Sequence, residues 1–333
     1  MSSTRAEASP ALADILAGMS ETGIGAHPTS LVETDTIGAG TTVGAFCRIS
    51  SGARIGARCD IRDHVRIDGG AVIGDGVLLH DGCRIASGVV VEDGVVVGPH
   101  AVTFSSAQLS RSGGEPARET RICKGAAIGA NATLMAGVTI GPRAVVGAGA
   151  VVLHNVPADA VVAGNPARIT GYAGLSPRRA PAPVAAAPDS PGAVPTRVRG
   201  VVFHYLPLIE DLRGNLAVGE AGRHVPFDIR RFFTVFGVED QKIRGEHAHR
   251  TLHQFLVCVH GSCHFVADDG ENREEYILDR PNLGLYVPPM IWGVQYKYSP
   301  DGVLLVLASA PYDPADYIRD YSEFLELVRA GKR

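Results

Sequence analysis

Residues 31–97 read LVETDTIGAGTTVGAFCRISSGARIGARCDIRDHVRIDGGAVIGDGVLLHDGCRIASGVVVEDGVVV. An aliphatic residue occupies every sixth position, from Leu31 through Ile37 and Val43 to Val97. This period matches neither the turn of an α-helix nor the alternation of a β-strand. Hexapeptide periods are typical of β-helices, in which three hexapeptides complete one triangular coil around inward aliphatic side chains. We therefore predict a parallel β-helix.

The period stops once, after Thr103. Residues 104–121 (FSSAQLSRSGGEPARETR) are polar, and the aliphatic series resumes from Ile122 to Val152. Binding residues often lie on polar loops that leave a rigid scaffold, although such a loop can also be a tolerated surface insertion. The sequence leaves both interpretations open.

The bulk properties exclude several classes of protein. The 333 residues carry a net charge of −4 with acids and bases interspersed, so we expect no nucleic-acid partner and no contact with an anionic membrane. No signal peptide or membrane span is expected from the apolar runs. Six cysteines without a CxxC pair predict reduced thiols and a cytoplasmic protein.

The chain changes character after a proline-rich segment, which is expected to be an extended spacer. Beyond it, runs such as Arg231–Val238, Gln254–Val259 and Val303–Ala308 predict an antiparallel barrel or sandwich. Pro314–Arg329 is predicted to form one amphipathic helix outside it. The expected fold is therefore all-β with two domains. The predicted boundaries are an N-terminal extension at 1–30, a β-helix at 31–175, a linker at 176–197 and a barrel at 198–333.

Two histidines stand out in the second domain. Strand alternation places His247 and His249 on one face, which indicates either metal ligation or proton transfer. The spacing from Gly245 through Gln254 to Gly261 resembles the first motif of the cupins, a family of double-stranded β-barrels. Metal-binding cupins have a glutamate where this chain has Gln254, and no histidine follows residue 264. We therefore expect no metal, and histidines that act as general acid and base.

The barrel sequence also resembles a particular enzyme family. The motifs RGEHAHR, QFLVCVHGSCHF, GLYVPPMIW, LLVLAS and DPADYIRDYSEF look like those of the sugar-nucleotide 3,4-ketoisomerases, over nearly all of residues 200–330. The resemblance implies a dTDP-4-keto-6-deoxyhexose substrate and a carbonyl shift through an enediol. Such a step requires a base of intermediate pKa in a pocket that holds little water.

The resemblance also implies roles for single residues. His249 would be the base at C3 and His247 the partner that shuttles or delivers the proton. The expected substrate-binding residues are Arg231 and Arg244 at the pyrophosphate, Gln254, and Trp292 in the pocket wall. Tyr286 fits either the pocket or the core. Relatives often carry a tyrosine pair where this chain has Phe233-Thr234, and a polar residue where it has Gly293, so the product configuration at C4 stays open.

The repeat domain resembles the sugar-nucleotide N-acetyltransferases, which are left-handed β-helices. The stretches GVVVGPHAVTF, GAAIGANATLMAGVTIGPRAVVGAGAVV and VVAGNPAR carry this resemblance within residues 31–172. It implies acetyl-CoA as the cofactor and a dTDP-3-amino-3,6-dideoxyhexose as the acceptor. The residues expected to contact the cofactor are Gly129, Ala130, Gly147 and Ala148 at the pantetheine, and Arg143 and Arg168 at the phosphates.

The acceptor side departs from that family. Relatives usually have asparagine, often with aspartate, where this chain has Ser105 and Ser106, and some carry a carboxylate at the position of Ser87. Of the remaining groups His100, taken to lie at the mouth of the excursion, is the best candidate for the base, and His80 is second.

Three hypotheses follow. In the first, a bifunctional enzyme isomerises the keto sugar and, after an external aminotransferase has acted, acetylates the amine. In the second, the barrel is an isomerase and the β-helix is only a trimerising scaffold. In the third, the barrel is a carbohydrate-binding module without catalysis. β-Helices that form trimers and barrels that form dimers would together close a homohexamer.

Overall fold

A computed structural model describes residues 25–105, 119–175, 177–179, 192–238 and 242–331. The chain divides into two compact units that meet between Gly174 and Leu175. The regular secondary structure of the described residues is almost entirely β, which confirms the predicted fold class. Ser106 and the predicted extension up to residue 24 lie outside the described residues.

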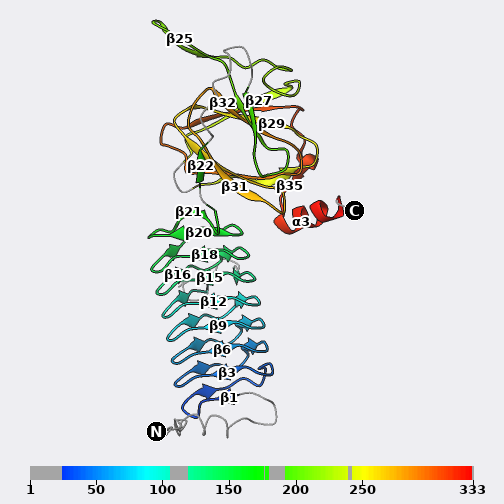
Figure 1. The fold of residues 1–333 in the computed structure, drawn as a ribbon. Helices are drawn as coiled ribbons and strands as arrows, with labels where there is room; N and C mark the ends of the chain where they lie inside the picture. The colour runs from blue at the N-terminus through cyan, green and yellow to red at the C-terminus, as the bar shows by residue number, and fades with distance from the viewer. Residues whose placement is uncertain (1–24, 106–118, 176, 180–191, 239–241, 332–333) are drawn as a thin grey trace, which may run out of the picture. The chain divides into compact units, whose positions relative to one another are not determined.

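The first unit is a parallel β-helix, visible in Figure 1 as a ladder of stacked coils. Strands at equivalent positions of successive coils pair in register, as Val43 does with Ile61 and Ile49 with Ile67. One sheet contains β1 (Gly25–Ala26), β3 (Thr42–Val43), β6 (Asp60–Ile61), β9 (Leu78–Leu79), β12 (Val96–Val97), β15 (Ala127–Ile128), β18 (Val145–Val146), β20 (Ala160–Ala163) and the antiparallel β21 (Arg168–Tyr172). The second contains β2 (Leu31–Val32), β4 (Arg48–Ile49), β7 (Arg66–Ile67), β10 (Arg84–Ile85), β13 (Val102–Thr103), β16 (Thr133–Leu134) and β19 (Val151–Val152). The third contains β5 (Arg54–Ile55), β8 (Val72–Ile73), β11 (Val89–Val91), β14 (Thr120–Ile122) and β17 (Thr139–Ile140).

The inward positions follow the hexapeptide series with one exception. From Val43 onward the aliphatic residues of the series are almost fully buried. Leu31 is 52% exposed, because Val32 pairs with Ile49 and takes the inward place. Ile49 follows Val32 by 17 residues but precedes Ile67 by 18, so the first coil is one residue shorter here. The prediction that Leu31 points inward is therefore wrong.

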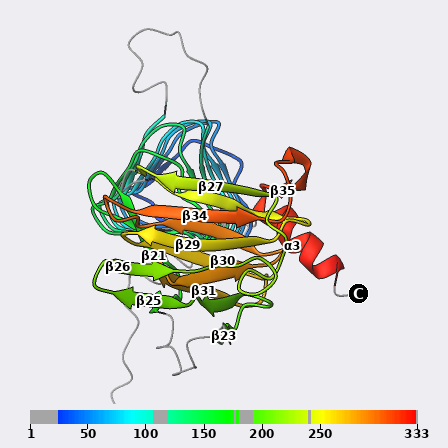
Figure 2. The same cartoon turned by 90° about the horizontal axis from the view of Figure 1, so that it is seen from above.

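The second unit consists of two facing sheets. The first has the order β22 (Pro177–Arg179), β31 (Arg273–Leu278), β30 (Cys263–Asp268), β33 (Trp292–Tyr296), β28 (Arg244–His249) and β35 (Tyr317–Ile318). The second has the order β23 (Gly192–Pro195), β24 (Val202–Tyr205), β32 (Leu283–Val287), β29 (Gln254–His260), β34 (Val303–Ala308) and β27 (Arg231–Phe236). Figure 2 shows β27, β34 and β29 side by side. A hairpin of β25 (Leu208–Asp211) and β26 (Gly214–Ala217) extends the unit.

Apolar side chains from both sheets form the core of the barrel. Phe203, Leu256, Leu285 and Val306 come from one sheet, and Phe265 and Tyr276 from the other; all are at most 3% exposed. Burying side chains of this size contributes about 1.5–3 kcal/mol each. The core occupies one part of the barrel interior, and the polar pocket described below occupies another.

Two segments differ from expectation. The predicted linker 176–197 is not a spacer at its ends, because Pro177–Arg179 pairs with β31 and Gly192–Pro195 pairs with β24. The predicted helix over 314–329 is instead a 3-10 turn, η1 (Pro314–Asp316), then β35, then α3 (Tyr321–Ala330). Asp320 starts α3 by accepting a hydrogen bond from the Glu323 amide, so the helix cannot include β35.

Candidate functional site

Strand β28 places both histidines on the inner face of the barrel, as predicted. His247 pairs with Gly293 of β33, and His249 pairs with Tyr317 of β35. A bulge between Gly245 and His247 shifts the register of this strand. The imidazole centroids of the two histidines lie 4.8 Å apart with perpendicular rings. The site is therefore built where the strand changes partner.

A continuous chain of hydrogen-bonding atoms runs through this pair. The Nδ1 atom of His249 lies 2.8 Å from Oδ2 of Asp316, and its Nε2 lies 3.1 Å from Nε2 of His247. At the other end, Nδ1 of His247 lies 2.8 Å from the carbonyl oxygen of Gly245. Asp316 is fixed in turn by the amide and hydroxyl of Thr251, each 2.7 Å from its Oδ1. Each histidine therefore has its Nδ1 atom bound to an acceptor.

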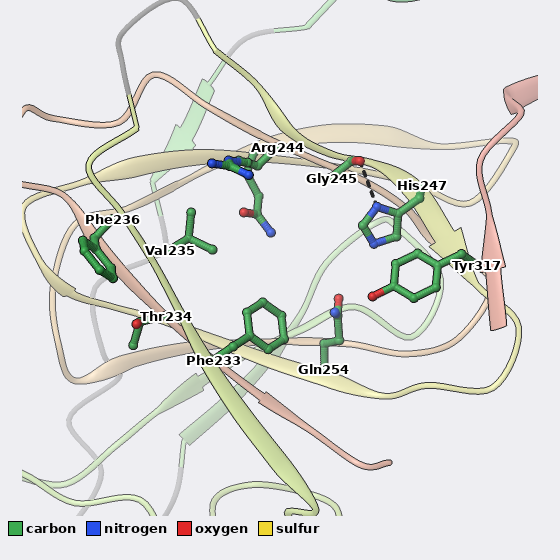
Figure 3. A pocket seen from close by; sticks show the side chains of 10 residues that line it. Phe233, Thr234, Val235, Phe236, Arg244, Gly245, His247, Gln254 and Tyr317 are labelled. Carbon is green, nitrogen blue, oxygen red and sulfur yellow. Dashed lines mark hydrogen bonds between the residues drawn. The ribbon is translucent and has the colours of Figure 1, made fainter. Parts of the chain in front are cut away.

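His247 faces a cavity of about 350 Å³, a volume ordinary for a small-molecule site. Figure 3 shows Arg244, Gln254, Phe233 and Tyr317 around the space into which the His247 ring points. The lining residues are Phe233, Thr234, Val235, Phe236, Arg244, Gly245, His247, Gln254, Gln295 and Tyr317. The pocket thus combines one arginine, two amides and aromatic walls.

A smaller recess of about 90 Å³ lies on the side of His249 and Asp316. Arg231 lines it, with its guanidinium 5.3 Å from the ring centroid of Phe233 and 5.6 Å from that of Tyr312. Its Nε atom is buried without a hydrogen-bond partner among the described residues. This geometry places the Arg231 side chain near the histidine pair.

Burial dominates the protonation of the pair. Burial lowers the pKa of His247, and it lowers the pKa of His249 to about 4. The neighbouring His247 lowers the pKa of His249 further, whereas Asp316 raises it. Burial by itself would raise the pKa of Asp316. Hydrogen bonds from Thr251 and His249 outweigh this, so the pKa of Asp316 lies below its usual value. Asp316 is thus an anion beside His249.

The structure brings Arg244, Gln254 and both histidines together, but not Trp292 or Tyr286. Because His247 pairs with Gly293, the preceding Trp292 points to the opposite face of the sheet. There it packs against α3, 5.2 Å from Tyr321 and 5.7 Å from Phe324. The prediction that Trp292 lines the pocket is wrong. The hydroxyl of Tyr286 lies 2.6 Å from Nδ1 of His253, away from the pocket.

Sequence reasoning missed several residues of the site, above all Asp316, Thr251 and Tyr317. The quoted motif DPADYIRDYSEF contains Asp316, but the sequence pattern predicts a helix over this segment. The motif also contains a turn signal, Asp313-Pro314. In the structure Asp313 accepts a hydrogen bond from the amide of Ala315 and so begins η1.

In the β-helix, the structure separates the candidates at the acceptor side. His100 is exposed at the corner before β13, and its ring lies over Gly82 of the preceding coil. The polar excursion leaves after the other end of β13, where Ser105 is buried. His100 is therefore not at the mouth of the excursion within one chain. Its catalytic role stays a prediction.

Gly129 and Ala130 lie at one corner of the β-helix, directly against Gly147 and Ala148 of the next coil. A Cβ atom at Gly129 would lie 2.5 Å from the amide nitrogen of Ala148, so the corner requires glycine. Arg143 makes a two-point ion pair with Asp159, with both N–O distances at 2.7 Å. Arg168 is exposed at the start of β21. The contacts of these residues with the cofactor stay predictions.

Among the residues that the structure describes, no group of histidine, cysteine, aspartate or glutamate has the geometry of a metal site. Within the same residues, no helix is both long and apolar enough to cross a bilayer.

Comparisons with known proteins assign each unit to a group. Residues 199–329 match the family described as WxcM-like, C-terminal, and residues 70–104 and 119–154 match the bacterial transferase hexapeptide repeats. The chain is 43% identical over 120 residues to the TDP-4-oxo-6-deoxy-alpha-D-glucose-3,4-oxoisomerase of Aneurinibacillus thermoaerophilus. That match covers 36% of this chain and 86% of the relative.

Two further matches concern one unit each. The dTDP-3-amino-3,6-dideoxy-alpha-D-galactopyranose 3-N-acetyltransferase of the same organism is 55% identical over 53 residues, which is 16% of this chain and 28% of that protein. A solved 3,4-ketoisomerase from Helicobacter canadensis is 38% identical, with a TM-score of 0.38, and covers 39% of this chain and 98% of its own.

The fold and the site define a β-helix joined to a cupin-type barrel that carries a hydrogen-bonded pair of histidines. Since the match extends over most of the oxoisomerase, the chain belongs to the WxcM-like family.

Proposed function

We propose that the barrel isomerises a dTDP-4-keto-6-deoxyhexose by moving its carbonyl group from C4 to C3. The observation that carries this proposal is the hydrogen-bonded pair of His247 and His249, in which Asp316 backs His249 and His247 lines a cavity of about 350 Å³. The named activity of the oxoisomerase relative supports the same reaction. No metal takes part in this proposal, because an imidazole pair supplies both the base and the acid.

In the proposed mechanism, His249 removes the proton from C3 and an enediol forms. His247 protonates the C4 oxygen, and the carbon proton is then delivered to C4. Arg244, which lines the cavity, is suited to hold the pyrophosphate, because guanidinium binds phosphate at two points. Arg231 lies beside His249, and we therefore assign it to the reacting end of the sugar rather than to the pyrophosphate.

The test is to incubate the full chain with dTDP-4-keto-6-deoxyglucose in deuterated water. Deuterium exchange at C3 and a new keto sugar are the expected results. If neither the exchange nor the product appears, the isomerase proposal fails.

We further propose that the β-helix transfers the acetyl group of acetyl-CoA to the amine of a dTDP-3-amino-3,6-dideoxyhexose. Its named acetyltransferase relative supports this, although the match spans only 28% of that relative. The two steps would flank an external aminotransferase, and one tethered chain would raise the local concentration of the intermediates. Saturable heat in a calorimetric titration with acetyl-CoA is expected. No heat would favour the alternative of a trimerising scaffold without transferase activity.

His100 is the proposed base of that transfer. Replacing His100 by glutamine is expected to lower the acetylation rate by about 10²-fold or more. His64→Gln is the matched control, since His64 is an exposed histidine at the equivalent corner two coils earlier, with φ of 58° against 56° at His100. Equal rates in both variants would remove His100 from the mechanism.

The alternative of a non-catalytic carbohydrate-binding barrel has less support. A binding module has no need of two histidines hydrogen-bonded to each other and to a buried carboxylate. Sugar binding without exchange at C3 would favour this alternative.

The proposed assembly is a homohexamer of β-helix trimers and barrel dimers. Light scattering on the full chain is expected to give the mass of six subunits, and a trimer or dimer would refute it. The described cysteines are all buried and free, which fits a reducing compartment, and we propose a cytoplasmic location.

A further inference from the structure

The hydrogen bonds of the histidine pair fix where its protons lie. Asp316 is a carboxylate and can only accept, so the Nδ1 atom of His249, 2.8 Å away, carries a hydrogen. The carbonyl oxygen of Gly245 also only accepts, so the Nδ1 atom of His247 carries a hydrogen as well. In a neutral imidazole the other nitrogen then has a lone pair and no hydrogen.

Two neutral rings would therefore point their lone pairs at each other. The Nε2 atoms lie only 3.1 Å apart, which is a hydrogen-bond distance. A hydrogen bond at this position requires one proton between the two nitrogens. The amide nitrogen of Gln254 lies 3.4 Å from Nε2 of His249 and approaches as a second donor. This contact assigns the acceptor role to His249 and the proton to His247.

We propose that His247 and His249 hold one proton in common between their Nε2 atoms in the resting enzyme, and that Asp316 is the positioning residue that keeps it there. The part this proton takes in isomerisation rests on the function proposed above. The presence of the proton does not, since it concerns the enzyme without substrate.

The charges around the pair explain why Asp316 is needed. Burial opposes a charge on either ring, and the cations of Arg231 and Arg319 oppose it further. Asp316 favours the charge, through both its hydrogen bond and its negative charge. The titratable and charged side chains around the pair are Asp313, Asp316, Arg231, Arg244, Tyr317 of β35, and Arg319 just after that strand.

A stored proton balances both halves of the proposed reaction. In the first half, His247 gives its Nε2 proton to the C4 oxygen while His249 takes the C3 proton, and the electron pair of the C–H bond forms the C3–C4 double bond of the enediol. In the second half, His249 returns its proton to C4 and His247 takes the proton of the C3 hydroxyl. The sugar leaves as the 3-keto isomer, and the pair again holds one proton.

The direct test is ¹⁵N NMR of the full chain with labelled histidine and without substrate, followed from mildly acidic to neutral pH, because burial lowers the pKa of both rings. His247→Gln and His249→Gln assign the signals. At the acidic end we expect the two rings together to carry one N–H proton more than two neutral imidazoles, and not two, and we expect them to lose it together as pH rises. A pair with only the protons of two neutral rings would overturn the proposal, while exchange at C3 would still decide the isomerase activity separately.

Asp316→Asn tests the positioning role. Because Thr251 donates two hydrogen bonds to Oδ1, the asparagine oxygen is expected to stay there and its NH₂ group to face His249. His249 would then lose its Nδ1 hydrogen and keep Nε2 protonated, which removes both the base and the stored proton. In a serine protease triad the same exchange lowers kcat about 10⁴-fold, and we expect about 10³–10⁴-fold here with KM little changed.

Asp320→Asn is the control, because Asp320 caps α3 and asparagine caps a helix equally well. It is expected to keep both the NMR signature and kcat. The pH profile gives a second readout: kcat/KM of the wild type should fall as pH rises and the pair loses its proton. A rate that rises with pH through this range, or an Asp316→Asn variant with unchanged NMR signature and kcat, would overturn the proposal.

Discussion

Gly245 and Gly293 approach each other closely across strands β28 and β33. A Cβ atom at Gly245 would lie 2.6 Å from the carbonyl oxygen of Gly293, and Gly245 has φ of 85°. The same Gly245 supplies the carbonyl oxygen that accepts the hydrogen bond from His247. The bulge at this glycine therefore sets both the strand contact and the orientation of His247.

Gly245→Ala is accordingly expected to lower the free energy of unfolding by about 1–3 kcal/mol, the usual range for a strained backbone position. Because the carbonyl at 245 must move, isomerase activity should fall as well. Urea unfolding and the C3 exchange assay measure the two effects. Gly219→Ala is the control, since a Cβ there would meet only Leu206, at 3.9 Å. Equal stability of the two variants would contradict the role of the bulge.

His249→Gln is expected to lower the rate of C3 exchange by about 10²–10⁴-fold, the range for loss of a general base. The fold should persist, because glutamine can still contact Asp316. His260→Gln is the matched control: His260 is exposed on the surface, 3.1 Å from Asp301. A His249→Gln enzyme as fast as the control would remove His249 from the mechanism.

The sequence predicted what local periodicity determines and missed what distant contacts determine. The hexapeptide series and the alternation of His247 and His249 need only neighbouring residues, and both appear in the structure. Asp316 lies 67 residues after His249, and only the pairing of β28 with β35 brings the two together. Trp292 failed as a pocket residue because its strand register was not known from the sequence.

The buried Glu275 gives a prediction for the dependence of stability on pH. Burial raises the pKa of this carboxyl, but hydrogen bonds from His264 and Tyr296 and the charge of Lys297 outweigh burial, so the pKa lies below its usual value. A carboxylate with a lowered pKa stabilises the fold above its unfolded pKa of about 4.3, and this contribution is lost as pH falls through the folded pKa.

Glu275→Gln is therefore expected to lower the free energy of unfolding by about 1–3 kcal/mol at pH 7. The difference from the wild type should shrink once the solution is acidic enough to protonate Glu275. Urea unfolding at neutral and at acidic pH measures it, with the exposed Glu326→Gln as control. A difference that stays the same at both pH values would contradict the assigned charge of Glu275.

The shorter first coil of the β-helix leads to a paired prediction for two members of the same hexapeptide series. Ile67 is fully buried, whereas Leu31 is 52% exposed. Ile67→Ala should lower the free energy of unfolding by about 2–5 kcal/mol, because it removes buried methyl groups and leaves a cavity. Leu31→Ala should change the free energy of unfolding by no more than about 0.5 kcal/mol, as exposed substitutions do.

Val32 occupies the inward position of the first coil in place of Leu31. Val32→Ala should therefore lower the free energy of unfolding more than Leu31→Ala does. Thermal or urea unfolding of the full chain ranks the three variants, and a larger loss for Leu31 than for Val32 would show that the first coil keeps the regular register.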